Sequence, residues 1–361
     1  MSLSERLPVF PWDRLAPFGD IARNHPDGIV DLSVGTPVDP VPPLIRRALQ
    51  SAADIPGYPL TAGTPELRAA LRDWLALHCG ADASVGVLPT IGSKELVGWL
   101  PTLLGAGPGD TVVLPRLAYP TYDIGVRVSG AEALVADSPS EIPSGTRPSL
   151  IWINSPSNPT GRVSTAGELR DWLAYARETG AVLAGDECYL TLGWDAEPVS
   201  VLSVCDGDYG GVLSVHSLSK RSNLAGYRAG FVGGDPALVA SLLEARKHTG
   251  MIVPAPVQAA MVAALGDEEH AAAQRELYRA RREVLRPALL ARGMRVEHSE
   301  AGLYLWATRD EDCWKTVEEF ASLGVLVAPG EFYGVAGGDH VRVALTAPDA
   351  LVASAAARLA G

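Results

Sequence analysis

The feature that most constrains the fold is the alternation of short apolar segments with helical segments through the first two thirds of the chain. Apolar, β-branched runs of strand length occur at 85–90, 111–114, 131–135, 150–153, 181–184 and 211–215. Such alternation is typical of a mostly parallel sheet covered by helices, in which strands are buried on both faces. We therefore expect an α/β domain with its ligand site beyond the carboxyl ends of these strands.

The remaining segments predict a second, smaller domain. Residues 1–30 contain Pro8, Pro11 and Pro17, which favour an arm of short elements over a long helix. A long charged helix is expected over 268–292, followed by short strands and two helices of α+β type. The predicted division is an arm over 1–30 that contributes to the small domain, a large domain over 31–265 and a small domain over 266–361.

Composition and charge argue against several functional classes. The net charge of −12 makes a nucleic-acid surface improbable. No apolar run approaches ~20 residues, so no membrane span is expected. Cys79, Cys188, Cys205 and Cys313 lack metal-ligand spacing, which predicts no metal site and a reducing, cytoplasmic compartment. No G-x-G-x-x-G motif follows a strand, so a nicotinamide dehydrogenase is not expected.

The segment after the run at 211–215 carries the strongest chemical signal. Lys220 lies between hydroxyl side chains and two arginines, Arg221 and Arg228. A lysine amine has a pKa of ~10.4 in water and becomes nucleophilic when it is desolvated or placed beside another cation. Hydroxyls and a guanidinium also bind phosphate. The segment alone is equally compatible with a lysine that ends a strand and reaches solvent.

Three further motifs follow apolar strands or begin helices. Ser93-Lys94 begins a predicted helix, where free N–H groups suit a phosphate, although an ordinary N-cap serine has the same pattern. Asn158-Pro159-Thr160-Gly161 reads either as a site or as a plain turn. Asp186 is followed by Tyr189, which fits a carboxylate for a protonated ring nitrogen and a nearby phenol, or a helix cap with a packing tyrosine.

Together these motifs resemble the class I and II aminotransferases, which are pyridoxal 5′-phosphate (PLP) enzymes of fold type I. The resemblance runs from Gly35 to Arg342. It is most specific in Ser217–Lys220 with Arg228, in the Asn-Pro-Thr-Gly turn, and in the pair Asp186 and Tyr189. It implies the PLP-dependent transferase fold, with a mostly parallel seven-stranded sheet in a large domain and a smaller α+β domain. It also implies PLP as the cofactor.

The resemblance assigns roles around the cofactor ring. Lys220 forms the Schiff base with PLP and later carries a proton between substrate and cofactor. Asp186 pairs with the pyridinium nitrogen, which makes the ring an electron sink. Tyr189 and Asn158 bond to the phenolic oxygen of the ring, and Tyr119 stacks on it.

The resemblance also assigns the phosphate and carboxylate contacts. The residues expected around the phosphate are Ser93, Lys94, Ser217, Ser219 and Arg228. Tyr58 is expected to reach the phosphate of a neighbouring subunit, which implies a homodimer with a shared active site. Arg342 is expected to bind the substrate α-carboxylate in a bidentate pair, with Gly35 and Asn158 beside it. By itself, Arg342 reads as a strand arginine paired at the surface, and only the resemblance favours the carboxylate role.

Two longer stretches, 31–41 and 246–258, resemble the N-succinyldiaminopimelate aminotransferases of actinobacteria. This implies ping-pong transfer between the glutamate/2-oxoglutarate pair and N-succinyl-2-amino-6-oxopimelate, a step of lysine and cell-wall precursor synthesis. The distal carboxylates of that substrate need donors. The candidates are Arg6, Arg23, Lys247 and His248, each of which also reads as a solvated surface charge.

Alternatives remain on the same cofactor. An aromatic, alanine or aspartate aminotransferase is one, although the additional arginine of aspartate-specific members has no counterpart here. A carbon–sulfur β-lyase, which releases pyruvate and ammonia without a keto-acid acceptor, is another. A cofactor-retaining regulator without catalysis is disfavoured because Lys220, Asp186 and Arg342 are all present.

Overall fold

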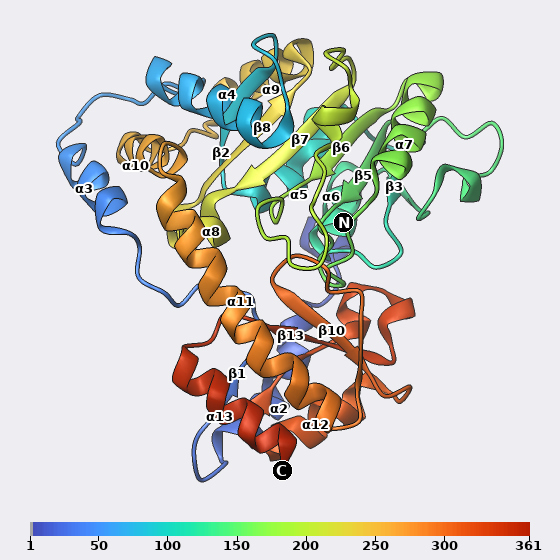
Figure 1. The fold of residues 1–361 in the computed structure, drawn as a ribbon. Coiled ribbons are helices and arrows are strands. Elements are labelled where there is room, and N and C mark those ends of the chain that lie inside the picture. Colours follow the sequence, from blue (N-terminus) through green and yellow to red (C-terminus); the bar gives the residue numbers. More distant parts are fainter. Residues whose placement is uncertain (1–2) are drawn as a thin grey trace.

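A seven-stranded sheet is the largest sheet of the protein. The computed structural model describes residues 3–361, except the side chain of Arg6. The strand order of the sheet is β2-β8-β7-β6-β5-β3-β4 (Figure 1). The strands are β2 (Gly86–Ile91), β3 (Thr111–Leu114), β4 (Glu132–Val135), β5 (Leu150–Asn154), β6 (Val182–Asp186), β7 (Val212–Ser217) and β8 (Ala229–Gly234). All pairs among β4, β3, β5, β6 and β7 are parallel, and β8 is antiparallel to both neighbours. The expected mostly parallel sheet is confirmed.

Helices bury both faces of this sheet, which explains why its central strands are apolar at consecutive positions. Ile151 and Leu183 belong to one core cluster, whereas Trp152 and Ala184 belong to the cluster on the opposite face. The first cluster includes residues of α4 (Pro65–Cys79), α7 (Ala166–Thr179) and α10 (Ala255–Leu265). The second includes residues of α5 (Ser93–Leu103), α6 (Thr121–Ser129) and α9 (Pro236–Thr249).

Strand β8 was not among the strands expected from the sequence, because three of its six residues are glycine. The glycines are required by close packing. A Cβ at Gly230 would lie 2.9 Å from the backbone of Gly92 and Ser93, and one at Gly233 would overlap Leu75. Because glycine is disfavoured in strands, a glycine-rich strand that packs closely against neighbouring segments is not predicted from residue propensities.

The C-terminal part contains a second, antiparallel sheet of four strands in the order β12-β13-β10-β9. These strands are β9 (Arg295–Glu297), β10 (Tyr304–Thr308), β12 (Ala328–Pro329) and β13 (His340–Ala344). One core cluster combines this sheet with α12 (Cys313–Ser322), α13 (Asp349–Ala360) and N-terminal residues such as Leu15, Ala22 and Leu32. We propose that the N-terminal segment and the C-terminal part together form the smaller domain.

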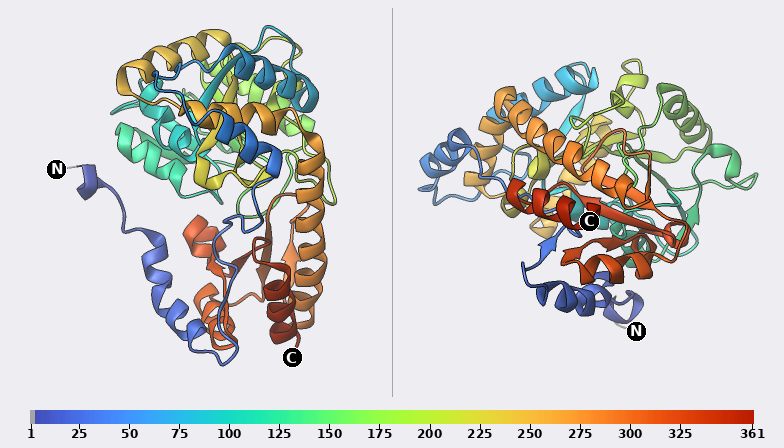
Figure 2. Two further views of the ribbon diagram at one scale, coloured as in Figure 1. Left: turned by 90° about the vertical axis from the view of Figure 1, so that its left-hand side faces the viewer. Right: turned by 60° about the horizontal axis from the view of Figure 1, so that its bottom comes forward.

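The two ends of the chain are joined by backbone pairing as well as by packing. Strand β1 (Val30–Asp31) pairs in parallel with β11 (Val325–Leu326). Helix α2 (Ala16–Arg23) packs against α12. Helix α1 (Leu3–Arg6) lies away from α2 and contacts α6, one of the helices that cover the large sheet (Figure 2). The N-terminal segment therefore bridges the two parts of the molecule.

Helix α11 (Glu268–Ala291) runs between the two parts along one side of the molecule (Figure 1). It begins at Asp267, whose side chain accepts hydrogen bonds from the N–H groups of Glu269 and His270. Its apolar residues Tyr278 and Leu285 face the C-terminal core, and its other faces are charged. Within residues 3–361, no helix is both long enough and apolar enough to cross a bilayer.

Candidate active site

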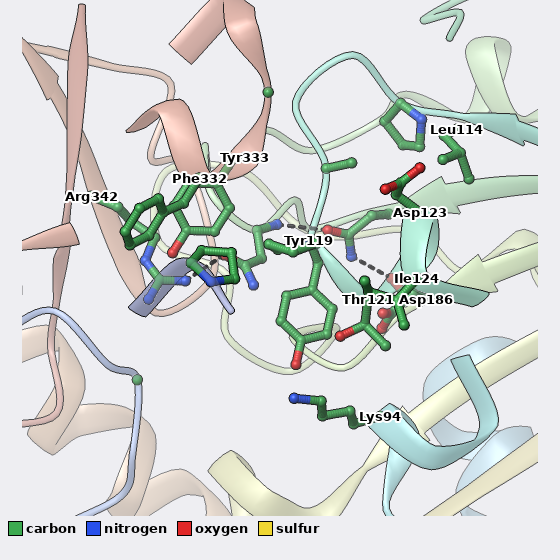
Figure 3. A pocket seen from close by; sticks show the side chains of 18 of the residues that line it. Lys94, Leu114, Tyr119, Thr121, Asp123, Ile124, Asp186, Phe332, Tyr333 and Arg342 are labelled. Atoms are coloured by element: carbon green, nitrogen blue, oxygen red, sulfur yellow. Dashed lines mark hydrogen bonds between the residues drawn. The ribbon is translucent and has the colours of Figure 1, made fainter. Parts of the chain in front are cut away.

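A cavity of about 1560 Å³ lies between the carboxyl ends of β5, β6 and β7 and the C-terminal sheet. In Figure 3, Arg342 and Tyr333 project into it from the C-terminal part, opposite Tyr119 and Asp186 of the large sheet. The large sheet also contributes Lys220 to the lining. The cavity therefore lies at the sheet edge that the strand pattern predicted.

Lys220 lies directly beyond β7 in the short helix α8 (Leu218–Arg221). Ser217 begins this turn, because its Oγ accepts a hydrogen bond from the N–H of Ser219 at 3.1 Å. The Nζ of Lys220 donates to the carbonyl oxygen of Gly35. Burial lowers the pKa of the Lys220 amine, and the charges of Arg342 and Arg228 add to this effect. The amine thus has the desolvated, cation-flanked surroundings that nucleophilic lysines need.

Asp186 is the last residue of β6, and its carboxylate is buried at the base of the cavity. Its Oδ2 accepts a hydrogen bond of 2.7 Å from the hydroxyl of Tyr122, and its Oδ1 accepts from the N–H of Cys188 at 3.3 Å. Burial raises the pKa of Asp186, and these hydrogen bonds oppose the increase. A carboxylate so held is well placed to bind a protonated nitrogen.

The N-terminus of α5, the end of β7, helix α8 and the loop after it form a corner rich in hydrogen-bond donors. Its predicted residues all line the cavity: Ser93, Lys94, Ser217, Ser219 and Arg228. A Cβ at Gly92, which precedes α5 with φ of 71°, would overlap the guanidinium of Arg228. Glycine therefore allows this arginine to lie directly against the N-terminus of α5, and together they suit an anion.

Arg342 is 3% exposed, so the surface-arginine alternative is wrong. It lies on β13, where its Nη1 donates to Oδ1 of Asn158 at 2.8 Å and its Nη2 donates to the carbonyl oxygen of Ser33 at 2.7 Å. Its guanidinium carbon lies 3.8 Å from the ring centre of Tyr304 and 4.8 Å from that of Tyr333. The two aromatic rings fix the plane of the guanidinium, which suits bidentate binding of a carboxylate.

Several predicted residues do not line the cavity of this chain. Tyr58 lies in the loop between α3 (Pro43–Ser51) and α4 and is 99% exposed. Lys247 forms a surface ion pair with Glu244. Arg23 pairs with Asp20, also at the surface, and His248 is exposed. The side chain of Arg6 lies outside the described residues.

Two residues that the sequence did not identify support the site. Tyr122 is buried in the core beneath the cavity and donates a hydrogen bond to Asp186. Tyr304 lines the cavity, where its ring packs on Arg342 and its hydroxyl lies 3.2 Å from the hydroxyl of Tyr189. Tyr122 lies on α6, three residues after Tyr119, which precedes the helix. Arg127, also on α6, lines the cavity.

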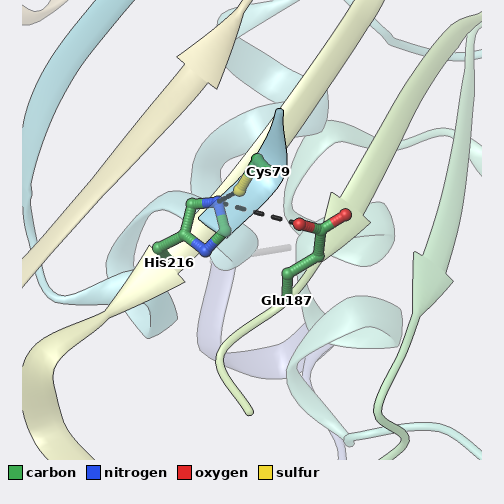
Figure 4. Close-up of side chains that lie close together, drawn as sticks. All are labelled: Cys79, Glu187 and His216. Atoms are coloured by element: carbon green, nitrogen blue, oxygen red, sulfur yellow. Dashed lines mark hydrogen bonds and ion pairs between the residues drawn. The ribbon is translucent and has the colours of Figure 1, made fainter. Parts of the chain in front are cut away.

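A second polar cluster, which contains Cys79, Glu187 and His216, is buried in the large domain (Figure 4). The Oγ of Ser214 lies 2.8 Å from Oε2 of Glu187 and 2.7 Å from Nε2 of His216, which is itself 3.8 Å from Sγ of Cys79. Burial raises the pKa of Glu187 to about 7 and lowers the pKa of His216 to about 3. The cluster ties β6 to β7 at the level of the cavity base.

The chain is similar to known proteins along almost its whole length. The model of the family "Aminotransferase class I and II" matches residues 27–359. The chain is 57% identical to the 4-dedimethylamino-4-oxo-anhydrotetracycline transaminase OxyQ of Streptomyces rimosus, over 98% of this chain and 99% of the relative. It is 59% identical to the probable aminotransferase Rv1178 of Mycobacterium tuberculosis, over 99% of this chain and 86% of the relative.

Solved structures share the fold along its whole length. One is the probable N-succinyldiaminopimelate aminotransferase of Thermus thermophilus, with a TM-score of 0.88 and 29% identity. The match covers 97% of this chain and 99% of the other.

Proposed function

This chain belongs to the class I and II aminotransferase family, and from that membership we propose that it transfers an amino group between glutamate and N-succinyl-2-amino-6-oxopimelate. Its family and fold make it a PLP-dependent transaminase of fold type I, as the motifs predicted. The observation that carries the proposal is the meeting of Lys220, Asp186 and Arg342 in one cavity. The likeness of residues 31–41 and 246–258 to actinobacterial enzymes supports this acceptor.

The donor set of the cavity fits PLP. The corner formed by the N-terminus of α5, two serine hydroxyls and Arg228 offers the donors that a phosphate needs. We propose that this corner binds the phosphate through Ser93, Lys94, Ser217, Ser219 and Arg228. Asp186 would then bond to the ring nitrogen, Tyr119 would stack on the ring, and Tyr189 and Asn158 would bond to its phenolic oxygen.

The residues around this position divide the work of transamination. When bound, PLP supplies an electron-withdrawing ring that stabilises the charge left when the substrate Cα loses its proton. Arg342 binds the α-carboxylate and so orients the Cα–H bond. The Nζ of Lys220 accepts that proton and returns one, and the lowering of its pKa by burial favours the neutral, proton-accepting form. Asp186 would keep the ring nitrogen protonated.

A long succinylated substrate needs donors beyond Arg342, and the cavity supplies candidates. Arg116 and Arg127 line it. Arg116 already bonds to Asp137 and Glu141, whereas Arg127 bonds through Nε to Asp123 at 2.6 Å. We therefore assign the distal carboxylate to Arg127 in place of Lys247, which lies outside the cavity of this chain.

A second candidate substrate is a fused-ring ketone, the class of compound for which the OxyQ relative is named. The observation that favours it is the aromatic and apolar lining of the cavity, which includes Phe10, Trp12, Leu114, Tyr119, Phe332 and Tyr333. Such a lining suits a flat, largely apolar body better than a chain of carboxylates.

The proposal is tested by absorbance spectroscopy of the purified holoenzyme before and after L-glutamate is added. We expect a visible band that moves to the near-ultraviolet as the cofactor is aminated. A band that ignores glutamate but bleaches with cystathionine, with release of pyruvate, would instead indicate a β-lyase. The absence of any visible band after incubation with PLP would contradict the assignment of Lys220.

The acceptor is tested with the aminated enzyme, to which each ketone is added in single-turnover experiments. Recovery of the visible band with N-succinyl-2-amino-6-oxopimelate supports the first candidate. Recovery only with 4-dedimethylamino-4-oxo-anhydrotetracycline would overturn it in favour of the second. 2-Oxoglutarate, which must restore the band in either case, is the control.

A further inference from the structure

Tyr304 occupies the junction between the carboxylate site and the cofactor site. It lies on β10 directly opposite Ala344, and its side chain is buried. One face of its ring carries the guanidinium of Arg342 at 3.8 Å. Its hydroxyl shares a hydrogen bond of 3.2 Å with the hydroxyl of Tyr189. Tyr304 therefore contacts one residue assigned to the substrate and one assigned to the cofactor.

The backbone around Tyr304 leaves room for its hydroxyl. A Cβ at Gly35 would overlap the Oη of Tyr304, so the glycine permits the ring to reach this depth. The carbonyl oxygen of the same Gly35 accepts the hydrogen bond from Nζ of Lys220. The lysine amine and the tyrosine hydroxyl are thus brought to the same peptide unit from two different sheets.

The charges around Tyr304 make its hydroxyl more acidic despite its burial. Burial raises the pKa of Tyr304, but the positive charges of Arg342 and Lys220 and the hydrogen bond with Tyr189 outweigh it, and the net change is a lowering. In return, the oxygen of Tyr304 opposes the lowering of the Lys220 pKa that burial causes. Several titratable or charged groups interact electrostatically with this hydroxyl. They are Cys188, Tyr189, Lys220, Tyr278, Tyr333 and Arg342.

Tyr333 provides a contrast within the same site. Its ring lies on Arg342 at 4.8 Å and is also buried. Its hydroxyl, however, has no hydrogen-bond partner among the described residues. The two tyrosines share their contact with the guanidinium and differ in what their hydroxyls contact.

We propose that Tyr304 is a positioning residue for the transamination reaction, whose hydroxyl fixes the hydroxyl of Tyr189 in the cavity that Lys220 also lines. The phenyl ring supports Arg342, and the hydroxyl serves the cofactor side. The inference rests on the proposed role of Lys220 as the Schiff-base lysine. The ring and the hydroxyl of Tyr304 thus have separate functions, and replacing tyrosine by phenylalanine removes only the hydroxyl.

The test compares the wild-type holoenzyme with Tyr304→Phe and Tyr333→Phe. The visible spectrum of each is titrated with pH at constant ionic strength, and kcat and KM for glutamate are measured. We expect the spectral midpoint of Tyr304→Phe to fall by about half a pH unit or more, the size expected when one hydrogen bond to a titrating system is lost. Its kcat should fall several-fold while KM for glutamate stays nearly unchanged, because the ring under Arg342 remains.

Tyr333→Phe is expected to keep the wild-type midpoint, since its hydroxyl bonds to no group in the described part of the chain. A Tyr304→Phe midpoint equal to the wild-type value would overturn the inference, as would an equal shift in Tyr333→Phe. A wild-type protein with no visible band would instead contradict the proposed function, and this inference with it. Thermal unfolding of the three proteins verifies that both variants are folded.

Discussion

At the scale of single residues, Arg127 distinguishes the cavity from a purely apolar one. It lines the cavity on α6, and its side chain is half exposed. The Nε of Arg127 donates a hydrogen bond to Asp123. The two terminal nitrogens of Arg127 have no hydrogen-bond acceptor within the described part of the chain. A guanidinium with one edge occupied and the other edge free can bind a second carboxylate.

We expect Arg127→Met to raise KM for the succinylated substrate about five- to tenfold with little change in kcat, because a ground-state contact is lost. KM for glutamate should change much less, since the shorter molecule extends less far from Arg342. Lys247→Met is the matched control, because Lys247 is a half-exposed cation outside the cavity. Steady-state kinetics with both substrates decide the matter, and equal KM changes for both would contradict the assignment.

Lys220 and Asp186 could be identified because each lies at the end of a parallel strand or just beyond it, and parallel strands bring such positions together at one edge of the sheet. Tyr304 lies inside the second sheet, so its position gave no such signal. The apolar pattern of 302–307 predicts a strand, but which residue faces Lys220 depends on how the two sheets pack, and this information is not local.

At the scale of elements, the network of Glu187, Ser214 and His216 holds β6 against β7. The N–H of Val201 also donates to Oε1 of Glu187 at 2.6 Å, so the carboxyl group fastens a following segment to the strand edge. Because Glu187 is adjacent to Asp186, the network also fixes the strand end that carries the cavity carboxylate. Burial favours the neutral form of both Glu187 and His216, as the raised pKa of the first and the lowered pKa of the second indicate.

This burial makes stability depend on pH. The pKa of Glu187 is raised from 4.5 to about 7, so its contribution is fully present below pH 4.5 and is lost as the pH rises through about 7. His216, with its pKa lowered from 6.5 to about 3, acts oppositely and loses its contribution as the pH falls below 6.5. Only the Glu187 contribution is removed by Glu187→Gln, since glutamine imitates the protonated acid.

We expect the free energy of unfolding of Glu187→Gln to match the wild type near pH 5 and to exceed it at pH 8 by an amount on the order of 3 kcal/mol. Urea unfolding at both pH values, with saturating PLP, measures the difference between the two proteins. The difference isolates Glu187 because His216 is present in both. A constant offset at the two pH values would show that the carboxyl group does not titrate in this range.

Strand β8 links the glycine pattern to the phosphate corner. A side chain at Gly230 meets the backbone of Gly92 and Ser93, whereas one at Gly233 meets the end of the flexible Leu75 side chain. We expect Gly230→Ala to raise the Kd for PLP about tenfold, because it displaces the N-terminus of α5. Gly233→Ala should lower Tm and leave the Kd unchanged. Fluorescence titration of the apoproteins measures both values, and equal Kd changes would contradict the link.

At the scale of the whole molecule, we propose that the chain forms the homodimer that its family resemblance implies, and the exposed loop around Tyr58 supports this. Tyr58 is 99% exposed, and Ile55 and Leu60 are about half exposed beside it in the sequence. An apolar loop of this kind is well suited to be covered by a second copy of the chain. The absence of Tyr58 from the cavity of its own chain agrees with the expectation that it serves the partner's site.

We expect analytical ultracentrifugation to give a dimer, and both Tyr58→Ala and Lys220→Ala to have greatly reduced activity. If the site is shared, dimers formed by mixing the two variants contain one intact site and regain activity. Wild-type subunits mixed with Lys220→Ala subunits serve as the control for subunit exchange. Exchange without regained activity would show that Tyr58 does not act across the interface.

The pairing of β1 with β11 has a consequence for how the molecule is made. A chain that leaves the ribosome from its N-terminus exposes Val30 and Asp31 long before Val325 and Leu326 have been synthesised. By that time every strand of the large sheet has emerged, since β8 ends at Gly234. The large sheet can therefore assemble during translation, whereas the first strand of the chain waits for almost the last. Synthesis of the final residues thus completes the wall of the cavity that carries Arg342.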